Sequence, residues 1–350
     1  MKDLALSVRD LRVELRLQGE WRAAVDGVSF DLREGEALGV VGETGCGKTL
    51  LGRALLNLAP EQARVSGTIR RRGRDLDRLT EEQWETVRGG EIALVFQEPA
   101  AALDPVQTIG SQILEAIRRH RRCSPGQARE IARDLLAEVS FPDPDRGLGD
   151  YPHRLSGGLK QRAFLAIALA GNPAILIADE PTTALDATVS ADVLELLDRL
   201  RRDRGLSLLL ITHDLGSVVR HCDRTLVLYA GRVVEEAATA ELFAAPRHPY
   251  TRGLLACLPR IGSAGGRGPR RFQAIPGVVP DLGFRPAGRC AFAPRCPDRF
   301  APCEAREPEL FDAGSGVARC FLYDPGTPAS LLAAAAPIRV DGPGSRAAGV

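Results

Sequence analysis

The pattern of apolar residues along the chain predicts an alternation of strands and helices. Five short runs are apolar throughout, which is typical of strands buried on both faces of a parallel sheet. These runs are Gly35–Gly42, Ile92–Phe96, Ala174–Ala178, Leu206–Thr212 and Thr225–Tyr229. The segments between them have helical character and include Lys48–Leu58, Gln107–Arg119, Pro125–Val139, Ser156–Ala170 and Ala187–Arg204. The sequence therefore predicts an α/β fold with a parallel sheet.

Two parts of the chain depart from this alternation. The stretch from about residue 98 to residue 155 is poor in strand patterns, so we expect a separate helical subdomain there. After Leu258 the composition changes, and the glycine-rich residues 262–271 predict a flexible linker. A cysteine-bearing segment follows. The Ala/Gly/Pro-rich tail over residues 324–350 is expected to be disordered toward its end.

Charge and hydropathy exclude several classes of protein. The 350 residues carry 46 basic and 45 acidic side chains, and a net charge of +1 argues against a dedicated nucleic-acid binder. No apolar run approaches the roughly 20 residues that span a bilayer. Charges interrupt the N-terminus too often for a signal peptide. We therefore expect a cytosolic protein that reaches any membrane through a partner.

Residues 42–49 match the phosphate-loop pattern G-x-x-x-x-G-K-[ST], between an apolar strand and a helix as the motif requires. The glycines let backbone N–H groups turn toward an anion, and the start of the helix adds a positive dipole. We expect every residue of this phosphate loop to bind nucleotide: Gly42, Glu43, Thr44, Gly45, Cys46, Gly47, Lys48 and Thr49. Lys48 should reach the β- and γ-phosphates, and the Thr49 hydroxyl should bind Mg²⁺.

A second group of polar residues follows the strands at their carboxyl ends, the edge where ligands bind in parallel sheets. Asp179 and Glu180 end the run AILIADE, and His213 follows the run LSLLLIT. We predict that Asp179 contacts Mg²⁺ and that Glu180 is the general base for the attacking water. A lone histidine is more often structural, but at this edge we assign His213 a hydrogen bond to the γ-phosphate.

With three further motifs, the chain resembles the ATP-binding cassette (ABC) ATPases. Leu155-Ser-Gly-Gly158 is similar to the signature that opens a helix in that family, although Gln161 does not follow it directly. Gln97 matches the glutamine of the loop that joins the core to the helical subdomain, and Ala184-Leu-Asp186 matches the loop after the acidic pair. All six motifs occur in family order, over roughly residues 4–236. The resemblance implies an ABC-type nucleotide-binding domain with an antiparallel β subdomain and a helical subdomain.

The resemblance also implies roles for individual residues. Gln97 joins Thr49 and Asp179 at Mg²⁺ and acts in catalysis beside Glu180 and His213.

The signature residues serve a second subunit. Ser156, Gly157 and Gly158 would bind the ATP of the partner, so that two subunits enclose two nucleotides head to tail and reopen after hydrolysis. Trp21 is our candidate for stacking on adenine. Simple packing is the alternative for this residue.

Finer features resemble the ATPases of dipeptide and oligopeptide importers. Residues 97–105 (QEPAAALDP) are similar to their extended glutamine loop, and residues 178–186 (ADEPTTALD) to the D-type member of their ATPase pair. Residues 246–251 (PRHPYT) resemble the motif that begins their C-terminal extension. The resemblance thus implies a nucleotide-binding domain over residues 1–245 and a small cysteine-containing extension over residues 246–323.

The function implied by this resemblance is to power peptide import from the cytoplasmic face of the inner membrane, to which the chain binds peripherally. The implied partners are an F-type ATPase that completes a heterodimer, two membrane permeases and a substrate-binding protein, and no nucleic acid. Residues 98–117 would contact a permease. The same machinery importing nickel or another small solute is one alternative, and a soluble ABC ATPase not coupled to transport is another.

Four of the eight cysteines, Cys290, Cys296, Cys303 and Cys320, fall within 31 residues. In a reducing compartment such a group predicts a metal site before disulfides. The intervals of five, six and sixteen residues lack the C-x-x-C pairs usual in zinc ribbons, while four thiolates suit an iron–sulfur cluster. Some of the peptide-importer ATPases that this segment resembles carry such a cluster, so we expect a structural [4Fe–4S] centre. Four reduced thiols in a packed segment are the alternative.

Overall fold

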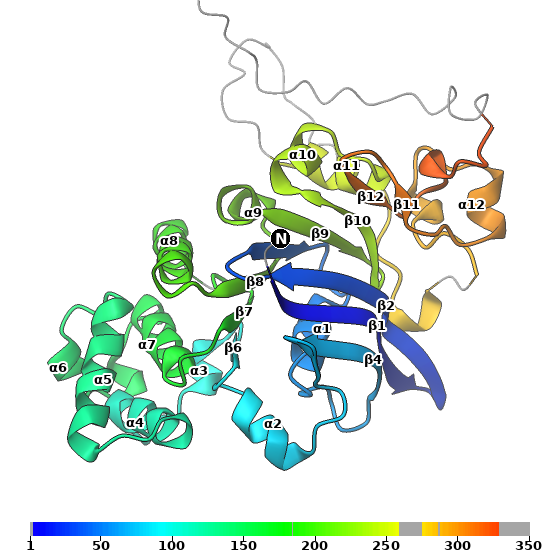
Figure 1. Cartoon of the computed structure of the whole chain (residues 1–350). Helices are drawn as coiled ribbons and strands as arrows, with labels where there is room; N and C mark the ends of the chain where they lie inside the picture. Colours follow the sequence, from blue (N-terminus) through cyan, green and yellow to red (C-terminus); the bar gives the residue numbers. More distant parts are fainter. Residues whose placement is uncertain (1–2, 184, 259–274, 286–287, 329–350) are drawn as a thin grey trace, which may run out of the picture.

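The five apolar runs form neighbouring strands that extend to one edge of an eight-stranded sheet, which has the order β11-β12-β10-β9-β3-β8-β7-β6 (Figure 1). The computed structural model describes residues 3–183, 185–258, 275–285 and 288–328. The five strands from β9 to β6 are parallel, and β10, β12 and β11 continue the sheet in antiparallel fashion. The strands are β3 (Ala37–Val41), β6 (Ile92–Val95), β7 (Ile175–Asp179), β8 (Ser207–Thr212), β9 (Arg224–Tyr229), β10 (Arg232–Ala238), β11 (Phe311–Asp312) and β12 (Gly316–Ala318). The predicted parallel sheet is confirmed.

Both faces of the parallel strands are covered, which explains why their sequences are apolar without alternation. In β8, Leu208 and Leu210 belong to one hydrophobic cluster, and Leu209 and Ile211 belong to the other. The first cluster contains side chains of helices α7 (Gly157–Leu169), α8 (Ala187–Arg204) and α9 (Leu215–His221). The second contains side chains of α1 (Lys48–Ala54) and of a separate antiparallel sheet.

The antiparallel sheet has the order β2-β1-β4-β5 and covers the α1 side of the core. Its strands are β1 (Leu4–Leu17), β2 (Glu20–Arg33), β4 (Arg64–Arg71) and β5 (Arg74–Asp75). It is the antiparallel β subdomain that the family resemblance implied. Helix α2 (Glu81–Val87) follows it and begins with a capping box in which the Thr80 hydroxyl accepts from the Gln83 backbone N–H.

The stretch predicted to be strand-poor forms a helical lobe, seen at the lower left of Figure 1. Its helices are α3 (Pro99–Ala102), α4 (Ile109–His120), α5 (Pro125–Glu138) and α6 (Pro144–Gly147). The first three pack with α7, and α6 packs with α5. The helix starts follow their sequence signals. Thr108 caps α4, and Ser124 forms a capping box with Gln127 at the start of α5, where Pro125 occupies the first turn.

The C-terminal region packs on the opposite end of the main sheet from the helical lobe (Figure 1). It contains α10 (Thr239–Ala244), α11 (Pro249–Ala256), α12 (Ala301–Ala305) and the strands β11 and β12, which extend the sheet beyond β10. Short 3-10 turns lie at Pro152–Arg154, Leu282–Phe284, Ala293–Arg295 and Phe321–Tyr323. The predicted linker, Ala184 and all but the first five residues of the predicted tail lie outside the described residues.

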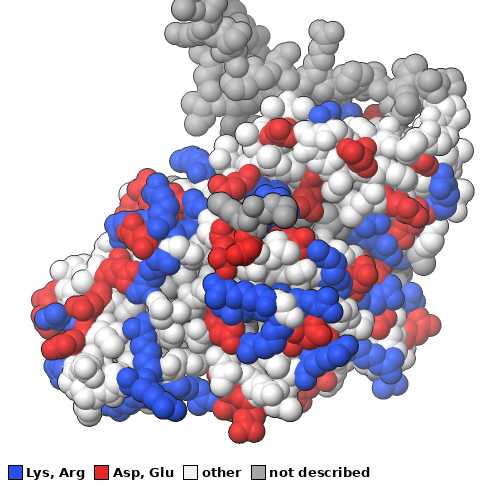
Figure 2. All heavy atoms as spheres, viewed as in Figure 1, with Lys and Arg blue, Asp and Glu red and all other residues white. Residues whose placement is uncertain are grey.

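Charges on the face seen in Figure 2 are mixed, with arginines over the antiparallel sheet interspersed with carboxylates. Arg9 pairs with Asp31 at 2.8 Å, and Arg72 pairs with Glu34 at 2.7 Å. Exposed pairs of this kind contribute about 0–1 kcal/mol to stability. Their main effect is to balance the positive charge of the surface locally.

Candidate nucleotide-binding site

The phosphate loop leaves the buried strand β3 and enters α1, as the sequence predicted. At two positions of the loop, only glycine fits, because a Cβ atom would collide with the backbone of a neighbouring strand. A Cβ atom on Gly42 would lie 2.2 Å from the Leu228 carbonyl oxygen, and one on Gly47 would lie 2.6 Å from the Ala24 carbonyl oxygen. Gly47 also has φ 109°, a left-handed conformation that disfavours other residues. The backbones of β9 and β2 thus leave no room for a side chain at these two positions of the loop.

Lys48 stands at the start of α1 with its side chain folded back into this loop. Its Nζ donates to the Gly42 carbonyl oxygen at 2.7 Å and to the Glu43 carbonyl oxygen at 3.1 Å, and the residue is 5% exposed. Nζ also lies 3.8 Å from Cys46 Sγ. A buried ammonium that has no carboxylate among these partners is well placed to bind an anion that enters the loop.

Thr49 and Asp179 form the second part of the site. The Thr49 hydroxyl donates to Asp179 Oδ1 at 3.2 Å, which joins α1 to the carboxyl end of β7. Burial raises the pKa of Asp179, and the Thr49 hydrogen bond partly opposes this rise. A hydroxyl beside a carboxylate is an oxygen donor set of the kind that Mg²⁺ prefers.

Glu180 follows Asp179 in the left-handed region, with φ 48°, and its N–H donates to the Ile211 carbonyl oxygen at 2.8 Å. Three side chains surround its carboxylate. Thr183 Oγ1 donates to Oε2 at 2.8 Å, Gln97 Nε2 donates to the same oxygen at 3.4 Å, and His213 Nδ1 lies 3.2 Å from Oε1. Burial tends to raise the pKa of Glu180, but the hydrogen bonds from Thr183 and His213 outweigh it and lower that pKa.

A cavity of about 340 Å³ opens beside these residues. Thr49 and Asp179 line one part of it, and Gln97 and Glu98 line another, with the end of α3 (Ala101 and Ala102) at its wall. The structure therefore brings together residues from four separate motifs: Thr49, Gln97, the pair Asp179–Glu180, and His213. Thr183, which also contacts Glu180, is the one residue around this carboxylate that the sequence analysis did not single out. Its position three residues after Glu180 was the available signal.

The signature lies at the start of α7 in the helical lobe. Ser156 is the N-cap of this helix, and its hydroxyl accepts from the Leu159 N–H at 3.4 Å. Ser156 and Gly157 are exposed, whereas Gly158 packs so closely that a Cβ atom there would lie 2.7 Å from Val189 of α8. The N-terminus of α7 is thus exposed, and backbone N–H groups at the start of a helix are able to bind an anion.

Trp21 lies on β2, paired with Arg16 of β1 near the tip of the hairpin. The guanidinium of Arg64 stacks on its ring, 3.9 Å from the ring centre. One face of the ring is thus already in contact with a cation.

Of the four C-terminal cysteines, Cys303 belongs to a small apolar cluster with Ala293 and Phe321, and Cys290 packs against that cluster. Cys296 packs against the main core. The Cys290 N–H donates to the Cys303 carbonyl oxygen at 3.1 Å. Burial raises the pKa of Cys290 to about 11 and that of Cys320 to about 12, and nearby thiols add to both shifts. Within the described ranges, no three His, Cys, Asp or Glu side chains are arranged as ligands of one metal ion.

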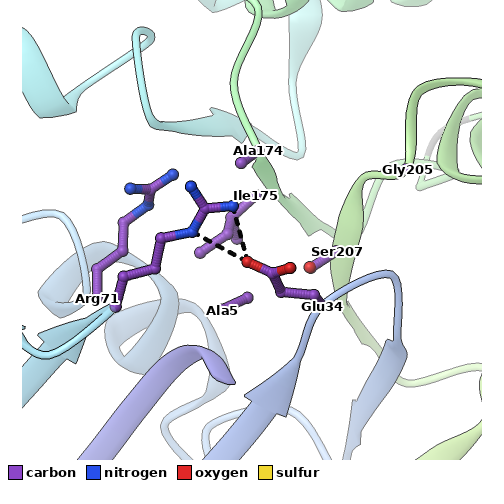
Figure 3. Close-up of a pocket in the computed structure, with 8 residues that line it drawn as sticks. Ala5, Glu34, Arg71, Ala174, Ile175, Gly205 and Ser207 are labelled. Atoms are coloured by element: carbon purple, nitrogen blue, oxygen red, sulfur yellow. Dashed lines mark hydrogen bonds and ion pairs between the residues drawn. The ribbon is translucent and has the colours of Figure 1, made fainter. Parts of the chain in front are cut away.

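A second cavity, shown in Figure 3, lies at the amino ends of β7 and β8, away from the phosphate loop. Glu34 points into it and binds Arg72, while Arg71 is paired with Glu91. It encloses only about 60 Å³. With both guanidinium groups already paired, it adds nothing to the nucleotide site.

The comparisons with known proteins agree with this geometry. Residues 25–183 match the ABC transporter family, and residues 234–303 match the family described as the oligopeptide/dipeptide transporter C-terminal region. The dipeptide transport ATP-binding protein DppD of Bacillus subtilis is 42% identical over 91% of this chain and 95% of its own length. The oligopeptide transport ATP-binding protein AppD of the same organism is 43% identical over 91% of this chain and 97% of its own length.

A solved structure, the dimeric post-hydrolysis state of the ATP-binding cassette MJ0796 with ADP and phosphate, superposes with a TM-score of 0.60. It is 26% identical and covers 67% of this chain and 98% of its own. In the part of the chain that the structure describes, no helix is long and apolar enough to cross a membrane. The chain belongs to the ATP-hydrolysing ATP-binding proteins of ABC transporters, and within them to those with the oligopeptide/dipeptide transporter C-terminal region.

Proposed function

We propose that the chain binds MgATP in the phosphate loop and hydrolyses it with Glu180 as the general base. The arrangement around the Glu180 carboxylate carries this assignment, because Thr183, Gln97 and His213 all converge on it. The carboxylate is ionised at neutral pH, the form that a base requires, and its lowered pKa makes it a weaker base than an ordinary glutamate. Its position one residue after Asp179 places it beside the proposed metal site.

Thr49 and Asp179 would hold Mg²⁺, with Gln97 at the far side of the same cavity. When bound, Mg²⁺ neutralises charge on the β- and γ-phosphate oxygens. The chain's own residues supply the rest. Lys48 binds the phosphates, Glu180 accepts the proton of the attacking water, and His213 donates a hydrogen bond at the γ-phosphate. Trp21 remains our candidate for the adenine.

We infer that catalysis takes place in a dimer. Ser156, Gly157 and Gly158 begin a helix whose N-terminus is exposed on the helical lobe, where a second subunit could present its ATP. The dimeric ADP-bound state named for MJ0796 supports this inference. Closure of two such subunits would exclude water from both nucleotides, and loss of phosphate would reopen them.

The transported substrate that we propose is a short peptide. The relatives named for dipeptide and oligopeptide transport align over nearly their whole length, including the C-terminal region. We assign this chain as the D-type subunit, paired with a different F-type ATPase, two permeases and a substrate-binding protein, at the cytoplasmic face of the inner membrane. Its role would be to convert ATP-driven closure into opening of the permeases.

An apolar groove beside the segment 98–117, of which Ala116 lines the groove, supports a permease contact there. It has a volume of about 240 Å³ and lies between the β6 edge of the sheet and the helices α4 and α7, with Leu58, Phe96 and Phe164 among its lining residues. Phe96 directly precedes Gln97. A permease helix seated there would lie next to the residue that contacts Glu180.

The iron–sulfur cluster remains a proposal for the four C-terminal cysteines. Their thiols influence one another electrostatically, but they do not form a preformed ligand set for one ion. The proposal therefore rests on the sequence, where four cysteines without C-x-x-C pairs suit a cluster better than a zinc ribbon. Binding would require the thiols to lose their protons, which their raised pKa values oppose in the absence of iron.

Steady-state ATPase of the assembled transporter tests the catalytic assignment. Glu180→Gln should retain nucleotide binding and lose most turnover, because phosphate contacts survive while proton transfer does not. Lys48→Ala should instead weaken nucleotide binding. Glu304→Gln, on the exposed face of α12, is the matched control and should retain turnover. Near-normal turnover in Glu180→Gln would contradict the role of Glu180.

A further inference from the structure

Three side chains of the C-terminal region reach the phosphate loop, although more than 200 residues separate them from it in sequence. Tyr250 Oη accepts from the Glu43 N–H at 2.9 Å. Arg295 binds the Glu43 carboxylate with two hydrogen bonds, of 2.8 and 3.0 Å. Arg285 donates to the Gly45 carbonyl oxygen at 3.2 Å and to the Ala23 and Ala24 carbonyl oxygens at 2.9 Å each.

Tyr250 is fixed by the His-Pro-Tyr motif to which the nucleotide chemistry assigns no role. His248 caps α11, and its Nδ1 accepts from the Tyr250 N–H at 3.0 Å. The His248 N–H in turn donates to the fully buried Glu235 of β10 at 2.8 Å. The Tyr250 ring is buried against Tyr229 and Phe292, with ring centres 4.6 and 5.4 Å away. Only its hydroxyl is left to contact the phosphate loop.

Burial and a backbone hydrogen bond also fix the side chain of Arg295. Its side chain is 5% exposed, and its Nε donates to the Pro276 carbonyl oxygen at 2.8 Å. It lies between Phe292, which packs on Tyr250, and Cys296. Two parallel hydrogen bonds between a guanidinium and a carboxylate set both distance and direction, so the position of Glu43 follows the position of Arg295.

Glu43 needs such a partner because of where it stands. It is the second residue of a loop that is built to bind a highly negative triphosphate, and a free carboxylate there would repel the ligand. Its backbone carbonyl already accepts from Lys48 Nζ. With Arg295 on its carboxylate and Tyr250 on its N–H, Glu43 carries a compensated charge that is turned toward the C-terminal region.

We propose that Tyr250 and Arg295 are positioning residues for ATP, which neutralise Glu43 and hold it away from the phosphates so that the loop stays open to the nucleotide. This proposal rests on the proposed role of the phosphate loop. It gives the C-terminal region a direct part in nucleotide affinity. Cys290 and Cys296 flank the segment that carries Phe292 and Arg295. Folding of the cysteine-bearing segment is therefore connected to the proposed ATP site through the contact between Arg295 and Glu43.

Equilibrium titration of the full-length chain with a fluorescent ATP analogue tests the proposal. Arg295→Gln should weaken binding about tenfold, the order expected for loss of one charge-assisted hydrogen-bonded pair. Adding Glu43→Gln to Arg295→Gln should recover most of the affinity, because the unpaired charge is then gone. A merely structural role of Arg295 would give no such recovery. Tyr250→Phe keeps the ring packing and should weaken binding about threefold, as for one neutral hydrogen bond.

Asp298→Asn is the matched control. It breaks the ion pair between Arg252 and Asp298, which is similarly buried in the same region and does not touch the phosphate loop. This variant should bind the analogue like the unmodified chain.

The proposal is overturned if Arg295→Gln and Tyr250→Phe bind normally, if Asp298→Asn weakens binding equally, or if Glu43→Gln gives no recovery. Failure of the proposed function would be distinguishable. In that case the unmodified chain would not bind the analogue, or Lys48→Ala would bind it equally well.

Discussion

At the residue scale, the behaviour of Glu180 depends on its neighbours more than on its own strand. Its left-handed backbone turns the carboxylate toward Thr183 and His213, which come from the following loop and from the end of β8. These hydrogen bonds overcome the effect of burial and lower the pKa of Glu180. The carboxylate therefore stays ionised to a lower pH than an ordinary glutamate does.

Removing one of these bonds should change the pH dependence of hydrolysis. A group with a lowered pKa stays ionised until the pH falls through that pKa, so loss of the Thr183 hydroxyl should make turnover fail at a higher pH. Thr183→Val is expected to shift the acid limb of the kcat profile upward while KM changes little. Ser190→Ala, which removes a hydroxyl bound to the Thr182 carbonyl on the same loop, should leave the profile in place. An unshifted acid limb in Thr183→Val would contradict this account.

Single residues also show where sequence reasoning ends. Lys48, Thr49, Asp179 and Glu180 were assigned from motifs in which each residue type is fixed by its chemistry. Glu43 occupies a position that the motif leaves unspecified, and its partners lie more than 200 residues away. No local pattern announces such a contact, because the pairing is created by the docking of the C-terminal region on the main sheet.

At the scale of elements, prediction followed the strength of the local signal. Helix α8 was predicted over its observed range, and α5 to within one residue, because caps and periodicity mark their ends. The residue pattern does not predict the strands β1, β2 and β4. Bulges interrupt their pairing, including one at Asp10 with φ 49°, and so break the two-residue alternation that marks a strand.

Substitutions at Ser156, the N-cap of helix α7, can separate its structural role from its proposed role in the partner's ATP site. Ser156→Ala should lower the free energy of unfolding by about 1 kcal/mol, the usual effect of losing an N-cap. Ser156→Asp keeps a good cap but places a negative charge where the partner's triphosphate is proposed to bind. It should therefore unfold normally and yet lose ATP-dependent dimerisation, measured by light scattering in the Glu180→Gln background. Ser124→Asp makes the same change at the N-cap of α5 and should dimerise. Normal dimerisation by Ser156→Asp would argue against the role in the partner's site.

Iron analysis tests the cysteine segment. After anaerobic purification, we expect iron and sulfide in the chain and a broad visible absorption, all of which Cys303→Ser should lose. Cys123→Ser, at the loop between α4 and α5, should retain them. Colourless protein without iron or zinc would eliminate the site. Stoichiometric zinc would retain the ligands and replace the cluster.

At the scale of the whole molecule, the main sheet connects three separate regions: the apolar groove, the candidate nucleotide site and the C-terminal region. The apolar groove lies at the β6 end beside the helical lobe, the nucleotide residues lie at the carboxyl ends of the central strands, and the C-terminal region continues the sheet from β10 (Figure 1). Gln97 follows β6 and touches Glu180, whereas Tyr250 and Arg295 approach the phosphate loop from the other side. The proposed ATP site thus lies between the proposed permease contact and the C-terminal region that carries the four cysteines.

The groove offers a test of this arrangement in the assembled transporter. Leu58 is 37% exposed and lines the groove, so a charge at this position would be buried against an apolar permease helix at a considerable cost in free energy. Leu58→Glu should therefore bind ATP as the unmodified chain does but fail to co-purify with the permeases. Val65→Glu is the matched control, because Val65 is 41% exposed on β4 and does not line the groove. It should co-purify normally. Full recovery of the permeases with Leu58→Glu would place their contact elsewhere on the chain, and equal loss with Val65→Glu would show that any added surface charge disturbs assembly.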